Sequence, residues 1–283
     1  MNEGPDKDGI LMPKFDMGAA WEDSMTLLRS YSGLTWAIAA VFFFLPTLAV
    51  SWFGPTPIEP AAGATFDQIM AAMGANVRQG LPYQLLVALI AAIGGVGILR
   101  LWLSRTGVSV GEALTFAAKM APTVIAVQLI LFVALVLAVL ILFAPGIAAG
   151  RGGAGVLLLV VGLLIFLGLS AYFWGRLSTI SAVIADRALH NPFAAIREAW
   201  ALTKGNGWRI FLFLFLVTLV ILIIAAILGG IVAAIVGTGS DAGRILIGLV
   251  EGGVAAVSGM VTLAIVAATY RQLAIRESGE IFG

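Results

Sequence analysis

Six long apolar runs dominate the pattern of this 283-residue chain, and charged residues fall almost entirely between them. The runs cover residues 30–58, 79–99, 120–150, 152–175, 210–240 and 245–270. A helix needs about 20 apolar residues to cross the hydrocarbon core of a bilayer, so each run is long enough for one membrane span. The pattern therefore predicts an all-α membrane protein with six transmembrane helices.

A short polar segment directly before the fifth run predicts a helix of another kind. Asn191 can cap its start, a proline suits its first turn, and Gly205 can end it. Phe193, Ile196 and Trp200 then fall on one helical face, away from the charged residues. Such a pattern is typical of an amphipathic helix that lies in the headgroup layer of a membrane.

Similar polar segments precede the first and third runs, so we expect an internal repeat. In each copy an acidic residue comes early and a basic residue comes late, namely Glu22 and Arg29, Glu112 and Lys119, and Glu198 and Lys204. The even-numbered runs also end alike, at Arg100, Arg176 and Arg271. The sequence predicts three parallel repeats at about 17–106, 107–188 and 189–276, each a surface helix followed by a transmembrane hairpin.

The chain outside the spans predicts a simple domain organisation. Residues 1–16 mix glycine, proline and charges of both signs, which predicts a flexible cytoplasmic tail before one six-span domain at 17–283. After the first run, Phe66, Met70 and Met73 recur at helical spacing in a long connection. We expect a second kind of surface helix there, which covers the bundle in preference to acting as a substrate lid.

Basic residues predict the orientation of the spans. If the loops alternate across the membrane, thirteen of the sixteen Lys and Arg residues share one side. They are Lys7, Lys14, Arg29, Arg100, Arg105, Lys119, Arg176, Arg187, Arg197, Lys204, Arg209, Arg271 and Arg276, against Arg78, Arg151 and Arg244 on the other side. Cytoplasmic loops carry the excess of positive charge, so both termini are expected in the cytoplasm.

Glycine divides the spans into two kinds. Residues 34–53, 121–144 and 210–228 contain none, whereas the even-numbered spans are rich in it. Small residues let membrane helices approach closely, so we expect the even spans to pack innermost and the odd spans to face lipid. Gly248, Gly252 and Ala256 form the clearest stripe.

Composition excludes several classes of function. With 61% hydrophobic and 11% charged residues the chain lacks the polar surface of a soluble domain, and its net charge of +1 gives no reason to expect nucleic acid as a partner. The sequence has no cysteine, one histidine (His190) and no catalytic motif that we recognise, so we expect neither a metal site, nor a cofactor, nor an enzyme.

Seven charged residues remain as candidates for function. Six basic residues at the predicted cytoplasmic boundary could form a ring that binds anionic lipid headgroups: Arg29, Arg100, Lys119, Arg176, Lys204 and Arg271. The favoured alternative is that they only orient the spans. The seventh, Glu251, lies inside the sixth run and is a candidate for a proton-relay or substrate role. The favoured alternative is a position within about two turns of the start of that helix, where the helix dipole stabilises an anion.

Short motifs carry a family resemblance. Ala185-Asp186-Arg187, Asn191-Pro192-Phe193 and the segment from Trp200 to Arg209 are three of them, and Pro82 to Leu86 and Tyr270 to Leu273 are two more. In these the chain resembles the membrane domain of some bacterial glycerophosphodiester phosphodiesterases and the YciC-type bacterial inner-membrane proteins. The resemblance implies a six-span protein of the bacterial inner membrane. It carries over no catalytic residues, because in the phosphodiesterases the chemistry belongs to a separate soluble domain.

These observations favour a non-enzymatic membrane module that binds membrane lipids, anionic phospholipids among them, or a partner membrane protein. The alternative is a transporter or channel for a lipid or small amphiphile, for which parallel repeats would be suitable. An intramembrane enzyme is the least favoured class, because no catalytic constellation is visible in the sequence.

Overall fold

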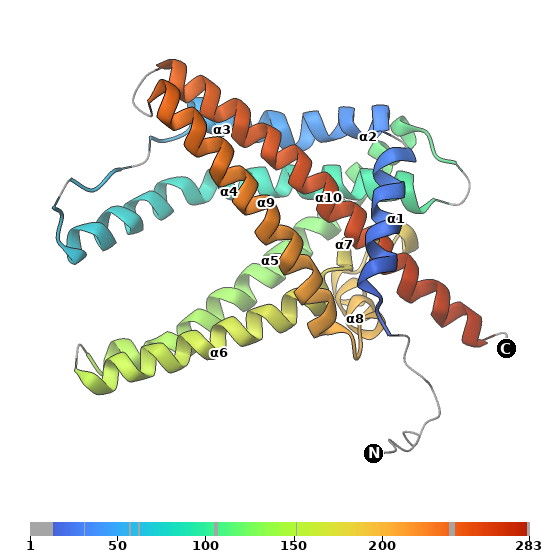
Figure 1. Ribbon diagram of the computed structural model, residues 1–283. Coiled ribbons are helices and arrows are strands. Elements are labelled where there is room, and N and C mark those ends of the chain that lie inside the picture. The colour runs from blue at the N-terminus through green and yellow to red at the C-terminus, as the bar shows by residue number, and fades with distance from the viewer. Residues whose placement is uncertain are drawn as a thin grey trace. The chain divides into compact units, whose positions relative to one another are not determined.

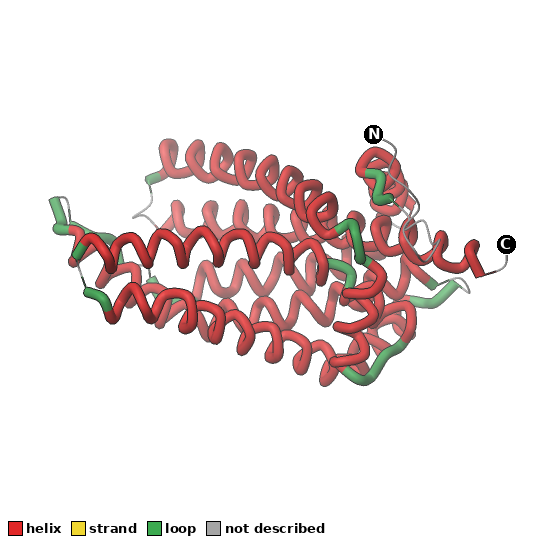
Figure 2. Tube along the Cα trace, turned by 90° about the horizontal axis from the view of Figure 1, so that it is seen from below, coloured by secondary structure: helices red, strands yellow, loops and turns green. Residues whose placement is uncertain are grey.

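The computed structural model describes residues 14–281 except 31, 57, 62, 105–106, 151 and 238–240, with side chains except at 32, 241 and beyond 274. This part of the chain is helical and has no strand (Figure 2). Six of its helical segments are long and apolar enough to cross a membrane, as the sequence predicts. Most of the predicted tail, Lys7, Arg105, Arg151 and the side chain of Arg276 lie outside the described residues.

The first span is built from consecutive helical segments. After α1 (Met17–Ser30) come α2 (Ser32–Ala39), the π-helical turn η1 (Ala40–Phe44) and α3 (Leu45–Phe53). In the π turn the Leu45 N–H donates to the Ala40 carbonyl oxygen, five residues back. Pro46 follows and has no N–H, and its ring would crowd the carbonyl four residues earlier in an ordinary α-helix. The wider turn relieves that crowding.

Helices α4 (Phe66–Leu103) and α5 (Val110–Ala148) are longer than the spans they contain. The predictions of a separate surface helix after residue 66 and of another ending at Lys119 are therefore wrong. Each helix starts at a capping box, formed by Thr65 with Gln68 and by Ser109 with Glu112. No cap interrupts either helix afterwards, so the polar turns and the apolar run join into one helix.

The second half of the chain forms the remaining five helices (Figure 1). They are α6 (Gly153–Leu177), α7 (Ile180–Arg187), α8 (Pro192–Leu202), α9 (Gly207–Val236) and α10 (Asp241–Ile281). Helix α8 is separate from α9, as predicted for the segment before the fifth span, and the Asn191 side chain caps it by accepting from the N–H groups of Phe193 and Ala194. It packs through Ala195, Ala199 and Leu202, while Phe193 is exposed.

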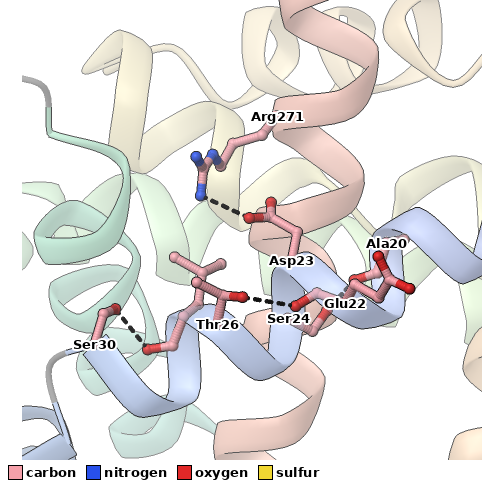
Figure 3. Close-up of polar contacts among 8 residues, drawn as sticks. Ala20, Glu22, Asp23, Ser24, Thr26, Ser30 and Arg271 are labelled. Atoms are coloured by element: carbon pink, nitrogen blue, oxygen red, sulfur yellow. Dashed lines mark hydrogen bonds and ion pairs between the residues drawn. The ribbon is translucent and has the colours of Figure 1, made fainter.

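The helices group into two compact units, which we describe separately. Unit 1 comprises Met1–Thr26, Pro122–Leu216 and Ala264–Gly283. Polar contacts join its distant segments: the Phe15 N–H donates to Asn206 Oδ1 at 2.9 Å, and Arg271 on α10 forms an ion pair with Asp23 on α1 at 3.1 Å (Figure 3). Phe15 is also buried against Phe213. The structure thus places Phe15 with the folded protein, although the sequence assigns it to the tail.

Unit 2 comprises Leu27–Ala121 and Val217–Leu263. Glycines of α4 and α10 pack against aromatic side chains of the first span. A Cβ added to Gly252 would lie 2.9 Å from Phe44 Cδ2, and one on Gly259 would lie 3.0 Å from Phe43 Cδ1. A Cβ on Gly94 would collide with Phe42. The stripe of Gly248, Gly252 and Ala256 is buried as predicted.

Burial of the spans corrects the predicted division into inner even and outer odd helices. Within their most apolar stretches, 44% of residues in α4 and 33% in α10 are buried, but only 6% in the fourth span. That fourth span is less buried than any odd-numbered one, although it carries Gly155, Gly162 and Gly168. Gly162 packs closely on the Leu142 backbone of α5, whereas a Cβ on Gly168 would meet nothing within 4 Å. Glycine content alone therefore does not place a span in the interior.

Candidate functional site

The structure assigns the six basic candidates to both units. Arg176, Lys204 and Arg271 belong to unit 1, and Arg29, Arg100 and Lys119 belong to unit 2. The ring of six that the sequence suggests therefore stays a prediction. The side chains differ sharply in burial and in contacts, which separates residues that look equivalent in the repeats.

Arg176 is the most unusual of the six. It lies one residue before the end of α6 and is only 3% exposed, while its guanidinium carbon lies 4.3 Å from the centre of the Trp200 ring. A Cβ added to Gly207 would lie 2.7 Å from Arg176 Cδ, so the aliphatic stem packs closely on that glycine. Its Nε and Nη1 are buried and have no hydrogen-bond partner among the described residues.

The Thr203 hydroxyl joins the backbone at Arg176 to helix α8. Thr203 Oγ1 donates to the Arg176 carbonyl oxygen at 2.7 Å and also lies 2.8 Å from the Ala199 carbonyl oxygen of α8. Thr203 is fully buried. This contact joins the end of α6 to the turn that follows α8, which brings the backbone of Arg176 next to that turn.

Aromatic side chains cluster next to the Arg176 guanidinium. Tyr172 lies 5.9 Å from both Trp200 and Trp208, and Phe173 lies 5.4 Å from Trp200, measured between ring centres. Trp208 and Phe173 are exposed, although their surroundings are apolar. Tyrosine and tryptophan gather where a membrane meets water, so this cluster is the kind of environment in which lipid headgroups are met.

The other five basic residues have more ordinary surroundings. Arg271 forms the ion pair with Asp23 and is 40% exposed at its side chain. Arg100 lies over the Phe116 ring, 4.6 Å from its centre. Arg29, Lys119 and Lys204 are exposed. Arg176 is thus the only one of the six candidates with buried side-chain nitrogens that lack a hydrogen-bond partner among the described residues.

Glu251 faces a cavity in unit 2. The cavity has a volume of about 660 Å³ and lies between α3, α4, the start of α10 and the loop after α3. Helix α10 begins at Asp241, earlier than the predicted start of the sixth span, so Glu251 lies ten residues into the helix. That distance is about three turns, and the helix dipole fades within the first turn. The dipole explanation favoured from the sequence therefore fails, and the cavity takes its place.

The cavity has two ends that differ in chemistry. At the loop end, nearest residues 54–59, are Glu59, Asn76 and Arg244. At the inner end, toward the middle of the spans, are Thr47, Val87 and Glu251. Between them α4 contributes one polar face with the spacing of neighbouring helical turns, namely Asn76, Gln79, Gly80 and Gln84.

Two contacts fix the loop end. Asn76 accepts from the Ile58 N–H at 2.7 Å and donates to the Ile58 carbonyl oxygen at 3.0 Å, which ties the loop to α4. Arg244 Nη2 donates to the Trp52 carbonyl oxygen at 2.8 Å, which ties α10 to the end of α3. The walls of the cavity are therefore joined by hydrogen bonds near the loop.

Sequence reasoning found Glu251 but missed the cavity. Its lining comes from segments up to about 200 residues apart, Thr47 and Glu251 being the extremes. One local signal was available, because Asn76, Gly80 and Gln84 are four residues apart and lie on one face of the helix. Arg176 was found, but nothing in its neighbouring sequence distinguishes it from Arg100 and Arg271.

Comparison with models of known protein families, with curated proteins and with solved structures found no match to this chain.

Proposed function

We propose that this chain is a non-enzymatic multi-pass protein of the bacterial inner membrane that binds the phosphate of an anionic lipid headgroup at Arg176. The observation that carries the proposal is the buried guanidinium with two nitrogens unpaired among the described residues. A buried donor without an acceptor is destabilised by about 1–3 kcal/mol, and by more when it is charged. A phosphate oxygen would remove that penalty and also neutralise the charge.

The shape of the arginine side chain suits it to binding a phosphate. The guanidinium fork can give a phosphate two parallel hydrogen bonds, and lysine cannot. The guanidinium carbon lies 4.3 Å from the centre of the Trp200 ring, a distance at which the cation is attracted to the face of the ring. The aromatic cluster supports a lipid as the source of the phosphate, because it is typical of the membrane interface.

The test is lipid retention by an Arg176→Lys variant that keeps the charge. We expect phosphatidylglycerol or cardiolipin bound to the purified protein, quantified by native mass spectrometry, to fall about tenfold, which corresponds to about 1.4 kcal/mol. Arg197→Lys, at an exposed arginine of α8, is the matched control and should retain its lipid. Equal retention in both variants would leave orientation of the spans as the only role of Arg176. Competition by inorganic phosphate separates a free-phosphate site from a lipid site.

Orientation belongs to the same proposal. We propose that both termini are cytoplasmic, which is supported by the thirteen-to-three distribution of basic residues over the predicted loops. Because the chain has no cysteine, single cysteines report cleanly. A cysteine at Thr56 should react with an impermeant thiol reagent applied from the periplasm, and one at Ser104 should not. The reverse pattern would invert the orientation.

Membership in the YciC-type proteins stays a proposal, supported by the motifs around Asn191 and Tyr270.

The second candidate function, transport of a small amphiphile, is favoured by the cavity that contains Glu251. Uptake of labelled solutes and lipids into proteoliposomes tests it. Uptake that is lost in Glu251→Gln would replace the binding module by a transporter.

A further inference from the structure

We propose that the cavity of unit 2 binds a small zwitterion, with the ammonium group of the ligand at Glu251 and its anionic group at Arg244. This inference is independent of lipid binding at Arg176, and it holds whether or not the ligand is carried across the membrane. A cavity of about 660 Å³ is in the range that holds small organic ligands.

At the inner end of the cavity, the Glu251 carboxylate favours a cationic group of the ligand. Glu251 has no hydrogen bond or ion pair within the described part of the chain, although it lies in a membrane-spanning helix. An ionised carboxylate in such a place needs a partner or water, and intramembrane carboxylates mark ligand or ion pathways. Thr47, the nearest polar residue of α3 at this end, donates its hydroxyl to the Phe43 carbonyl oxygen. A protonated amine is the partner that Glu251 lacks.

The loop end calls for an anion. Arg244 uses one nitrogen, Nη2, for the Trp52 carbonyl oxygen, which carries no net charge. Its remaining donors make no hydrogen bond within the described residues, and the side chain is exposed to the cavity. A carboxylate or phosphate can therefore bind Arg244 without displacing the contact that joins α10 to α3.

The spacing of the two charges sets the size of the ligand. Arg244 and Glu251 are seven residues apart, so they lie on one face of α10 about 10 Å apart along its axis. Gln79 and Gln84 of α4 line the cavity between the two ends and offer amide donors and acceptors. A ligand whose charges are separated by several bonds would reach both ends.

The order of the charges argues for a free zwitterion over a lipid headgroup. In phosphatidylethanolamine the ammonium group is at the tip of the headgroup and the phosphate lies nearer the bilayer. Arg244 is close to the start of the span and Glu251 is nearer its middle. A lipid entering from that surface would place its ammonium at Arg244 and its phosphate at Glu251, with like charges facing at both ends.

Matched probes test the pairing of charges on the purified full chain. Isothermal titration should detect 6-aminohexanoate binding. The probes 6-aminohexanamide, which lacks the carboxylate, and N-acetyl-6-aminohexanoate, which lacks the amine, should bind about tenfold more weakly or not at all. Equal affinity for all three probes would overturn the proposal. Failure of 6-aminohexanoate and of the shorter 5-aminopentanoate and 4-aminobutyrate to bind would also overturn it. Competition by nanodiscs that contain phosphatidylethanolamine, but not by phosphatidylglycerol alone, would overturn the free ligand in favour of the lipid.

Variants locate the binding in this cavity. Glu251→Gln and Arg244→Gln should each weaken 6-aminohexanoate binding about tenfold. Glu22→Gln, at an exposed carboxylate outside the cavity lining, should leave the binding unchanged. Gly80→Leu should abolish binding by filling space, because an added Cβ there meets nothing within 4 Å. Gly74→Leu, on the same helix and equally unobstructed, is the matched control outside the cavity lining. Loss of binding in Gly74→Leu, or full binding in Gly80→Leu, would place the ligand elsewhere.

Discussion

The contacts that join distant segments within unit 1 differ in kind from those within unit 2. In unit 1, segments far apart in the chain meet through polar groups, as when the Tyr270 hydroxyl donates to Asp186 at 2.6 Å. In unit 2, the spans meet through glycines packed on aromatic rings, such as Gly252 on Phe44, and the long-range hydrogen bond from Arg244 to Trp52 lies at the end of α3. Close packing of small residues is the usual means of joining helices where water is absent. Polar contacts between distant segments are expected where the chain leaves the hydrocarbon, because each such group would otherwise lack a partner inside it.

The largest effect is expected at the glycine contacts of unit 2. Gly252→Leu should lower the midpoint of thermal unfolding in detergent, because overpacking an interior destabilises it by about 1–3 kcal/mol. The added side chain would start 2.9 Å from Phe44 Cδ2, where no space is available.

The control is Gly168→Leu on α6, where an added Cβ meets nothing within 4 Å. This variant should unfold at about the same temperature as the unmodified protein. A comparable loss in both variants would mean that glycine is needed for helix geometry in general and not for the contact with the first span.

A smaller effect is expected at the buried hydroxyl of unit 1. Thr203→Val keeps the shape of the side chain but removes the donor to the Arg176 carbonyl oxygen. A net loss of about 1 kcal/mol is typical for such a hydrogen bond, and a lower thermal midpoint would show it. Thr26→Val is the control, because the Thr26 hydroxyl is exposed and bonds within its own helix at 3.0 Å. Similar losses in both would remove the distinction between local and long-range polar contacts.

The smallest effect is expected at the ion pair of unit 1. Asp23→Asn removes the charge that faces Arg271, with both side chains about a third exposed. Exposed pairs contribute about 0–1 kcal/mol and weaken with salt. Thermal unfolding at low and high salt should show a small difference that disappears at high salt. A loss as large as that of Gly252→Leu would mean that polar contacts dominate the stability of unit 1.

The sequence predicts the number of spans because length and hydropathy suffice for that. It also predicts the start of α8, because Asn191 and the proline after it act locally. It fails where the outcome depends on a distant partner. Nothing near Gly162 indicates that the fourth span stays largely exposed. Nothing near Glu112 indicates that its helix continues past Lys119 and through the third span.

The candidate sites divide in the same way. Glu251 is visible in the sequence as a charge inside an apolar run, but the cavity around it depends on three helices and a loop. Arg176 occupies the same place in its predicted repeat as Arg271, yet Arg271 contacts an acidic residue and Arg176 contacts a tryptophan. Similar places in the sequence therefore do not predict the contacts of a side chain.

The π-helical turn at Ala40–Phe44 has a consequence for how this chain can change in length. A π turn holds one residue more than an α turn between the same flanking helices. Loss of one residue within it would restore ordinary α-helix and leave α2 and α3 in their present register, provided that Pro46→Ala removes the ring that an ordinary α-helix would crowd. Loss of one residue from the middle of α3 would instead rotate everything beyond it by about 100° and turn Trp52 away from Gly248. The first span is thus expected to accept a deletion at this turn together with Pro46→Ala, and to reject a deletion farther along.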